Sequence, residues 1–217
     1  MSKKALCVDK EELLELNNFK DSSGNISMFI NPMSILSLEA FLLARPECET
    51  QYDSIQLLPY IILMDRESSN VLSYRRGKAG DENRLHNKCS IGFGGHIEDG
   101  YSYFSSVQTK IEVLALSALR ELNEELGFDL SQYNLHRLRE LIGGGNFEVF
   151  YSEQNEVSKV HLCILLKLNI NVNELKKLED GVICEPEWLT PEELLAKHKS
   201  GERELEGWSE IALDFIN

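Results

Sequence analysis

The sequence predicts an α/β fold with a mixed β-sheet, preceded by an N-terminal extension. Three observations support this prediction. Short apolar runs bounded by polar turns recur along the 217 residues, and such runs are typical of strands. Between these runs lie segments whose apolar residues repeat at helical spacing. The turns are hairpin-like, which favours one layered domain in which strands and a few helices are combined.

Size, charge and cysteine content narrow the class of protein. A hydrophobic fraction of 42% is enough for a packed core. The net charge of −14 argues against binding of a nucleic-acid polymer, because clustered Lys and Arg hold phosphate backbones. The five cysteines are scattered and form no C-x-x-C pair, so we expect reduced thiols and a cytoplasmic protein. The sequence shows neither an apolar leader nor a membrane-length run, and we expect no membrane partner.

Residues 1–50 form the predicted N-terminal extension, and residues 51–217 form the main domain. Ala5–Val8 suits a short strand, and Asp9 suits the N-cap of a short helix. Ser34 is expected to cap a second helix. The apolar residues of that helix would be Ile35, Leu38, Leu42 and Leu43. This much apolar periodicity argues against a disordered tail, so we expect the extension to pack on the main domain or to form a homodimer surface.

The main domain is expected to open with a buried strand, Leu57–Met64, and a hairpin partner, Val71–Arg75. A polar loop rich in cations follows, and Cys89–Phe93 is a further short strand. In an acidic protein this local excess of cations stands out. The loop is either an ordinary solvated loop or a place where substrate phosphates bind, with Arg76 and Arg84 as our candidates for phosphate contacts.

The later part of the main domain is expected to contain four strands and two helices. The strands are Leu135–Ile142, Phe147–Tyr151, Val160–Ile170 and Trp188–Leu189. The first two would pair about the turn at 143–146. Thr190 should cap a helix that has Pro191 at its first position and Glu193 at its third. The final helix would be Arg203–Ile216.

The most informative stretch runs from Gly94 to Phe128. Glu121, Glu124 and Glu125 are spaced by three and four residues, which places them on one side of a helix. Three carboxylates so close together repel one another unless a cation lies between them. A hard divalent cation such as Mg²⁺ prefers oxygen ligands. The glycine-rich segment before the helix would let a phosphate chain approach the backbone, so these residues predict a metal-dependent phosphoanhydride hydrolase site.

Residues 120–128, RELNEELGF, match the R-E-U-x-E-E-x-G-U half of the Nudix box, where U is a bulky aliphatic or aromatic residue. Glu112 and Arg120 have the E-x7-R spacing of the box, and GGHIEDG resembles its opening, with Gly95 as the first fixed glycine. Gly95 and Glu112 are separated by sixteen residues rather than five. We expect this insert to lengthen the loop before the helix and Thr109 to restart the helix with a capping box. The sequence resembles the Nudix hydrolase family.

The resemblance implies the Nudix α/β/α sandwich with its mixed sheet. It also implies hydrolysis of a nucleoside diphosphate linked to another moiety, with Mg²⁺ or Mn²⁺ as cofactor. Glu121, Glu124 and Glu125 are similar to the family's metal ligands, and the carbonyl of Gly95 would complete the shell. Arg120 would orient the carboxylates by pairing with Glu124, and Glu112 would also be structural.

The general base of such a hydrolase is either a glutamate of the box or an acidic residue of a later loop. Glu185 is our candidate in that loop, with Glu179 behind it, and plain solvated acids are the alternative for both. Several aromatic residues could stack on a base. They are Tyr101, Tyr103, Phe104, Phe147 and Tyr151. We treat His86 and His96 as supporting or surface residues, because no Cys/His ligand spacing surrounds them.

Three classes of function follow. The leading one is a pyrophosphohydrolase, a phosphoric anhydride hydrolase that acts on a small nucleotide such as a nucleoside triphosphate or a nucleotide–sugar. The alternative is a non-catalytic Nudix-fold module that binds a nucleotide and regulates another process. The intact carboxylates favour the enzyme, because a binding module has no need of a self-repelling cluster. A third class, a structural partner protein, depends on the N-terminal segment alone.

Overall fold

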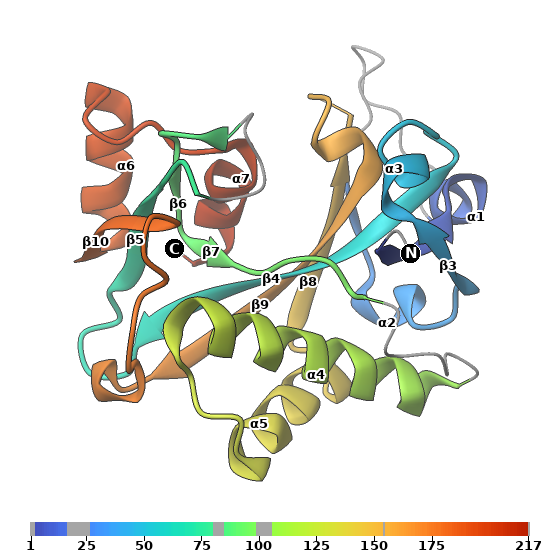
Figure 1. The fold of residues 1–217 in the computed structure, drawn as a ribbon, viewed down its shortest axis with the longest axis horizontal. Coiled ribbons are helices and arrows are strands. Elements are labelled where there is room, and N and C mark those ends of the chain that lie inside the picture. Colours follow the sequence, from blue (N-terminus) through green and yellow to red (C-terminus); the bar gives the residue numbers. More distant parts are fainter. Residues whose placement is uncertain (1–2, 17–26, 80–84, 99–105, 154, 217) are drawn as a thin grey trace. The chain divides into compact units, whose positions relative to one another are not determined.

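The structure is a computed structural model of the 217-residue chain, and it describes residues 3–16, 27–79, 85–98, 106–153 and 155–216 (Figure 1). The fold is α/β, as predicted, and the chain divides into two compact units. The first unit comprises Met1–Tyr60, Gly94–Leu119 and Ser131–Leu166, and the second comprises Ile61–Phe93, Arg120–Leu130 and Lys167–Asn217.

The first unit is built on antiparallel strand pairs. Its strands are β1 (Lys4–Asp9), β2 (Ser27–Ile30), β3 (Ala40–Ala44), the start of β4 (Ser54–Asp65), β8 (Phe147–Ser152) and the start of β9 (His161–Ile170). Its helices are α1 (Lys10–Glu15), α2 (Pro32–Ile35), α3 (Arg45–Cys48), most of α4 (Val107–Leu126), α5 (Gln132–Gly143) and the 3-10 turn η2 (Ser158–Val160). β1 pairs with both β3 and β4, and β8 pairs with both β2 and β9. The N-terminal segment therefore shares strand pairs with β4.

The predicted helix capped by Ser34 is wrong. α2 ends at Ile35, and Asn31 is its N-cap, accepting a hydrogen bond from the backbone N–H of Met33. Leu42 and Leu43 lie instead in β3, directly opposite Leu6 and Ala5 of β1. The apolar residues of this segment suited either helix or strand, and the long-range partner β1 decided for the strand.

The predicted strand at 135–142 is also wrong. This segment lies in α5, which Ser131 caps by accepting a hydrogen bond from the backbone N–H of Asn134. Leu135, Leu138 and Ile142 are buried, and their spacing of three and four is the spacing of one helix face. The predicted turn at 143–146 is the end of this helix, followed by β8.

The second unit contains the hairpin that the sequence predicts, since Met64 of β4 lies opposite Val71 of β5 (Val71–Arg76). Its other strands are β6 (Cys89–Ser90), β7 (Gly92–Phe93), β10 (Ile183–Leu189) and the end of β9. Its helices are the end of α4, the 3-10 turn η3 (Val172–Glu174), α6 (Pro191–Ser200) and α7 (Gly207–Ile216). β10 pairs antiparallel with β5, and an isolated parallel bridge joins Cys89 to Leu205, so strand directions are mixed.

Helix α4 begins earlier than predicted. Ser106 precedes its first residue, and the Ser106 hydroxyl accepts a hydrogen bond from the backbone N–H of Thr109 at 3.2 Å. The Thr109 hydroxyl in turn accepts from the backbone N–H of Ser106 at 3.0 Å. This reciprocal cap shows that Thr109 closes the first turn of α4 and does not precede the helix.

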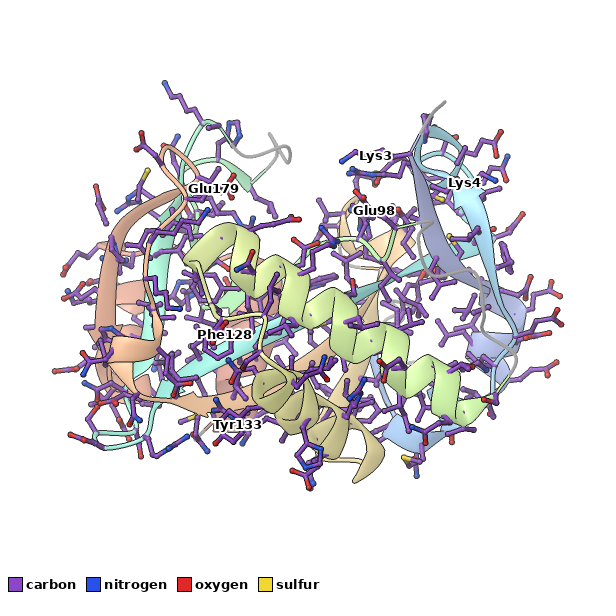
Figure 2. The ribbon with its side chains drawn as sticks, turned by 60° about the horizontal axis from the view of Figure 1, so that its bottom comes forward. Lys3, Lys4, Glu98, Phe128, Tyr133 and Glu179 are labelled. Atoms are coloured by element: carbon purple, nitrogen blue, oxygen red, sulfur yellow. The ribbon has the colours of Figure 1, made fainter. Side chains whose placement is uncertain are left out.

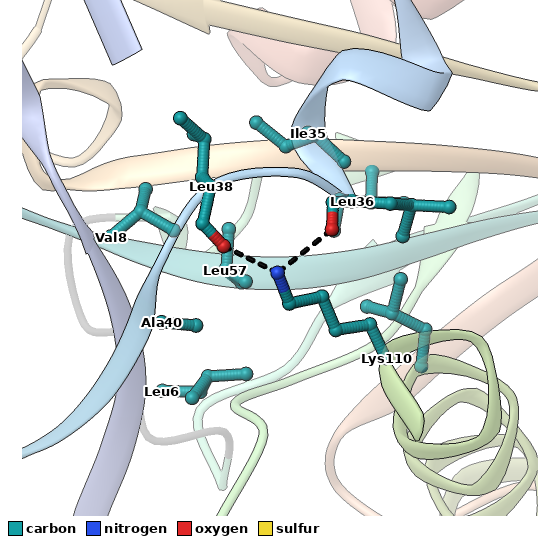
Figure 3. A pocket seen from close by; sticks show the side chains of 10 residues that line it. Leu6, Val8, Ile35, Leu36, Leu38, Ala40, Leu57 and Lys110 are labelled. Atoms are coloured by element: carbon teal, nitrogen blue, oxygen red, sulfur yellow. Dashed lines mark hydrogen bonds between the residues drawn. The ribbon is translucent and has the colours of Figure 1, made fainter. Parts of the chain in front are cut away.

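Lys110 is the one polar side chain among the apolar residues that line a small pocket in the first unit (Figure 3). The pocket lies between β1, α2, β3, β4, α4 and β9. The Lys110 ammonium donates hydrogen bonds to the carbonyls of Leu36 and Leu38, at 2.7 and 2.5 Å. Burial lowers the pKa of Lys110, and the two carbonyls compensate for part of the lost hydration.

All five cysteines are reduced, as predicted. Cys7, Cys48, Cys89 and Cys163 are buried, and Cys184 is half-buried. The thiols of Cys7 and Cys48 lie 3.4 Å apart inside the first unit. Burial raises the pKa of both thiols, so neither is a thiolate near neutral pH.

Across the described ranges, none of the helices combines the length and the apolar character needed to cross a membrane.

Candidate active site

The end of α4, in the second unit, carries the predicted carboxylates. Leu122 and Leu126 are fully buried on one side of this helix. Glu121 is buried, whereas Glu124 is exposed. The Arg120 guanidinium contacts the Glu121 carboxylate and donates a hydrogen bond to Glu124 at 3.0 Å. Arg120 therefore stands where a cation would balance these carboxylates, and its predicted pair with Glu124 is present.

The helix stops directly after these residues. Gly127 has φ +61°, a left-handed conformation that favours glycine. The backbone N–H of Gly127 donates to the Asn123 carbonyl, and that of Phe128 donates to the Leu122 carbonyl at 3.2 Å. Buried Phe128 then anchors the chain in the core. This left-handed cap fixes the last turn of α4 and with it the three glutamates.

A loop of the second unit covers the remaining carbonyls at this helix end. The backbone N–H groups of Lys176 and Lys177 donate to the Leu126 carbonyl at 3.2 Å each. The backbone N–H of Glu179 donates to the Glu125 carbonyl at 2.7 Å. Figure 2 shows Glu179 beside this end of α4. The loop that follows β9 thus brings an acidic residue next to the box.

Tyr74, a buried residue of β5, interacts electrostatically with the box residue Glu125. Its buried hydroxyl donates a hydrogen bond to the Gly92 carbonyl at 3.0 Å. Burial raises the pKa of Tyr74 first of all, and the charges of Glu125 and Glu206 raise it further, against the Arg76 cation. Tyr74, Glu125 and Glu206 are therefore close in the second unit, a grouping that sequence reasoning missed because Glu206 follows Glu125 by 81 positions (206 − 125).

Arg76 is held by Glu206. Its Nε donates to one Glu206 carboxylate oxygen at 2.7 Å, and its Nη2 donates to the other at 3.4 Å. The hydroxyl of Ser90 also donates to Glu206, at 2.6 Å. Glu206 is 3% exposed, so the Arg76 guanidinium balances the charge of a carboxylate that is buried away from water. Arg84, the second predicted phosphate contact, lies outside the described residues.

Glu185 has an unusual backbone and a cationic partner. Its φ of 48° is rare for a residue other than glycine. Its carboxylate accepts a hydrogen bond from Nε of Arg75 at 2.9 Å. That hydrogen bond, reinforced by the charge of Arg75, lowers the pKa of the Glu185 carboxyl. The lower pKa weakens Glu185 as a base.

The remaining box residues belong to the first unit. Gly94 passes so close to β4 that a Cβ atom there would lie 1.9 Å from the Pro59 carbonyl oxygen. Gly95 follows it, and the next residues pair with β1, because Ile97 accepts a hydrogen bond from the backbone N–H of Leu6 at 3.0 Å. Glu112 forms a two-point ion pair with Arg139, which joins α4 to α5.

Two of the predicted stacking aromatics are core residues instead. Phe147 is 4% exposed and Tyr151 is fully buried, so neither can stack on a nucleotide base from outside. β8 is covered on both faces from Val149 onward, and Glu148 is its one exposed residue, which explains this burial. Tyr101, Tyr103 and Phe104 lie outside the described residues.

A second cluster of ligand-type side chains lies in the first unit. Among the described residues, one group of three His, Cys, Asp or Glu side chains has its ligand atoms within 4.8 Å of one another: Glu49, His96 and His161. The box glutamates do not form such a group among the described residues, and Arg120 contacts two of them. The sequence treatment of His96 as a supporting or surface residue missed this cluster, because its partners are distant in the chain.

Comparison with known proteins supplies a relative and a fold. The chain is 31% identical to Protein YmaB of Bacillus subtilis (strain 168) over 163 residues, which are 74% of this chain and 70% of that protein. No protein-family model matches the chain. Its structure resembles the crystal structure of Tm1382, a candidate Nudix hydrolase, with a TM-score of 0.67, 24% identity, and coverage of 98% of this chain and 97% of that one. It also resembles DR0079 from Deinococcus radiodurans, with a TM-score of 0.51, 18% identity, and coverage of 80% and 90%.

Proposed function

We propose that this chain is a Nudix-type pyrophosphohydrolase. The chain belongs to the same family as Protein YmaB, and it has the Nudix fold. Its reaction is the hydrolysis of a phosphoanhydride bond in a nucleoside diphosphate linked to another moiety. The observation that carries the proposal is the end of α4. There, Glu121, Glu124 and Glu125 stand within five positions, on a helix end that Gly127 and the loop at Glu179 hold in place.

The donor set of this helix end fits a hard divalent cation. The three glutamates offer carboxylate oxygens, the ligands that Mg²⁺ or Mn²⁺ prefers. Arg120 already contacts two of these carboxylates, so a positive charge is accommodated at this place. Glu121, Glu124, Glu125 and the Gly95 carbonyl are the proposed ligands. Such an ion supplies charge neutralisation for the phosphate oxygens and lowers the pKa of a bound water.

The residues of the chain have three further proposed tasks. Arg120 orients Glu121 and Glu124 through its two contacts. Arg76 and Arg84 contact substrate phosphates, with the Nε and Nη2 edge of Arg76 engaged by Glu206. A carboxylate accepts the proton of the attacking water.

The proton acceptor is a glutamate of the box or one of two loop residues. Glu185 has a lowered pKa and an Arg75 partner, which disfavours proton uptake. Glu179 is bonded through its backbone to Glu125 and is exposed. We therefore rank Glu179 above Glu185. Steady-state rates of Glu179→Gln and Glu185→Gln, measured over a range of pH, separate the two candidates. The variant that removes the true base should lose turnover, and its pH–rate profile should lose the acidic limb.

The test of the function is a substrate panel. Nucleoside triphosphates and nucleotide–sugars are incubated with Mg²⁺, with Mn²⁺ or with a chelator, and the products are separated by chromatography. Hydrolysis in ¹⁸O-labelled water then shows which phosphorus is attacked. We expect turnover with either ion and none with the chelator. Tight binding of a nucleotide without turnover of any substrate would favour the regulatory module.

A further inference from the structure

We propose that Glu49, His96 and His161 form a binding site for a divalent transition metal of the Zn²⁺ type in the first unit, with ligands other than the box carboxylates. Three segments supply the side chains. Glu49 directly follows α3, and His161 is the first residue of β9. His96 follows β7 and precedes Glu98, the residue that forms a bridge with Ala5 of β1. A structural site at this place would fasten these segments together.

The spacing of the ligand atoms fits a tetrahedral ion. Two ligands that each lie about 2.0–2.1 Å from zinc at a tetrahedral angle are about 3.4 Å apart. Nε2 of His161 lies 3.3 Å from Nε2 of His96 and 3.7 Å from the nearer carboxylate oxygen of Glu49. Two of the three separations are thus close to those that one shared ion would impose, and the ligand atoms all lie within 4.8 Å of one another.

The orientation of His161 also suits a ligand. Its Nδ1 lies 2.7 Å from the carbonyl oxygen of Val157, an acceptor, so Nδ1 carries the proton. Nε2 then bears the lone pair and faces His96 and Glu49. A metal-binding histidine typically donates its other N–H to a carbonyl or a carboxylate, which fixes the ring and its tautomer. Because His161 is 4% exposed, that orientation is held by the core around it.

Gln56 provides an independent observation at the same place. It is fully buried on β4, and its amide nitrogen lies 3.1 Å from Nε2 of His161 and 3.2 Å from the Glu49 carboxylate. Its amide oxygen is buried and has no hydrogen-bond partner among the described residues. A rotation of the amide exchanges the oxygen and the nitrogen. The oxygen would then face the ion as a fourth ligand, which accounts for a buried amide in this position.

The chemistry of the ligands separates this site from the box. Two imidazoles and one carboxylate favour zinc and similar transition metals, whereas the all-oxygen box favours Mg²⁺ or Mn²⁺. The proposal therefore does not depend on the proposed hydrolase activity.

The test measures metal binding and stability, not turnover. The full chain is stripped with a chelator and titrated with Zn²⁺ by calorimetry, and the visible absorption of bound Co²⁺ reports a tetrahedral site with nitrogen ligands. We expect one tight Zn²⁺ equivalent and a Zn²⁺-dependent rise in the unfolding temperature. Glu49→Gln and His96→Asn, both at half-buried positions, should each weaken Zn²⁺ binding by at least about 100-fold, since even supporting residues cost 10–100-fold.

Two control variants make the outcomes distinct. His136→Asn replaces an exposed histidine of α5 and should leave Zn²⁺ binding unchanged. Glu124→Gln removes a box carboxylate and should also leave it unchanged. Zn²⁺ binding that survives both Glu49→Gln and His96→Asn, or that disappears in Glu124→Gln, would overturn the proposal. So would wild-type protein that binds no Zn²⁺, since Glu49, His96, His161 and Gln56 would then be a hydrogen-bonded polar cluster only.

Discussion

The box carboxylates at the end of α4 and the histidine cluster of the first unit are assembled in opposite ways. Glu121 and Glu125 are four positions apart, and one helix brings them to one side. Glu49 and His161 are 112 positions apart (161 − 49), and His96 comes from a third segment. The local sequence alone therefore groups the carboxylates, whereas the residues of the histidine cluster come together only once the strands have paired.

This difference also determines how each cluster is held. The carboxylates depend on the length and the cap of one helix, and Arg120 balances their charge from the same helix. The histidine cluster depends on separate segments of backbone, and Gly94, two residues before His96, closely approaches Pro59 of β4. A substitution that removes a side-chain contact within α4 should affect the box carboxylates alone. A substitution that moves the backbone of the first unit should affect the histidine cluster.

Glu124→Gln should give the largest effect. It removes a proposed ligand and one partner of Arg120, so metal-dependent hydrolysis should fall by at least about 100-fold, or about 2.7 kcal/mol in the activation barrier. Folding should be preserved, because Glu124 is exposed. Steady-state assays with Mg²⁺ and circular dichroism measure the two effects. Glu192→Gln, an exposed glutamate of α6, is the control, and near-full activity of Glu124→Gln would show that the ion binds elsewhere.

Gly94→Ala should strongly destabilise the first unit. Its new Cβ would lie 1.9 Å from the Pro59 oxygen, so the backbone must move, at a cost of about 1–3 kcal/mol in the free energy of unfolding. Because His96 is two residues away, Zn²⁺ affinity should also fall. Urea unfolding and calorimetry measure both. Gly143→Ala, where the nearest atom is 3.7 Å from the new Cβ, is the matched control, and equal stability of the two variants would contradict the close approach.

Glu112→Gln should have a smaller effect on stability and none on Zn²⁺ binding. It removes the two-point ion pair with Arg139, whose side chains are about one-third exposed. Solvent screening limits the loss to about 1 kcal/mol in the free energy of unfolding. Chemical denaturation measures it, with Glu148→Gln on the exposed side of β8 as control. A loss of several kcal/mol would mean that this pair supports more than the α4–α5 contact.

The Arg75–Glu185 pair should give the smallest effect, visible in acid. Because Arg75 lowers the pKa of Glu185, the stability that the pair contributes is present above the usual pKa near 4.5 and is lost as the pH falls through the lowered value. Arg75→Gln should raise the Glu185 pKa toward its usual range, as NMR titration of the carboxyl would show. Arg66→Gln is the control. An unchanged pKa in Arg75→Gln would disprove the pairing in solution.

The same contrast explains which elements could be predicted from sequence. The hairpin of β4 and β5, the Thr190 cap of α6 and the spacing of the box all follow from neighbours in the chain. The predictions failed at Ser34–Leu43 and Leu135–Ile142, where short apolar segments suit a helix or a strand equally. A tertiary partner decided the first segment, since β3 pairs with β1. In the second segment the buried residues Leu135, Leu138 and Ile142 follow a helical period, and α5 buries that face.

The candidate active site also contains residues that the local sequence groups and residues that only the fold brings together. The spacing of the glutamates and the Arg120–Glu124 pair could be predicted from the sequence, whereas the contacts of Glu206, Tyr74 and His96 could not. Glu206 follows Ser90 by 116 positions, and the segment before α7 must lie along β6 to bring their side chains within 2.6 Å. No periodicity in the sequence records such a contact.

The burial of the cysteines has a practical consequence for following these variants. Because Cys184 alone of the five is not fully buried, a maleimide reagent should label the native chain at one position in β10. Unfolding would expose the other four thiols. The number of labels per chain, read by mass spectrometry, would then count how many molecules have opened, and partial labelling of Cys7 and Cys48 without Cys89 would identify the first unit as the part that opens first.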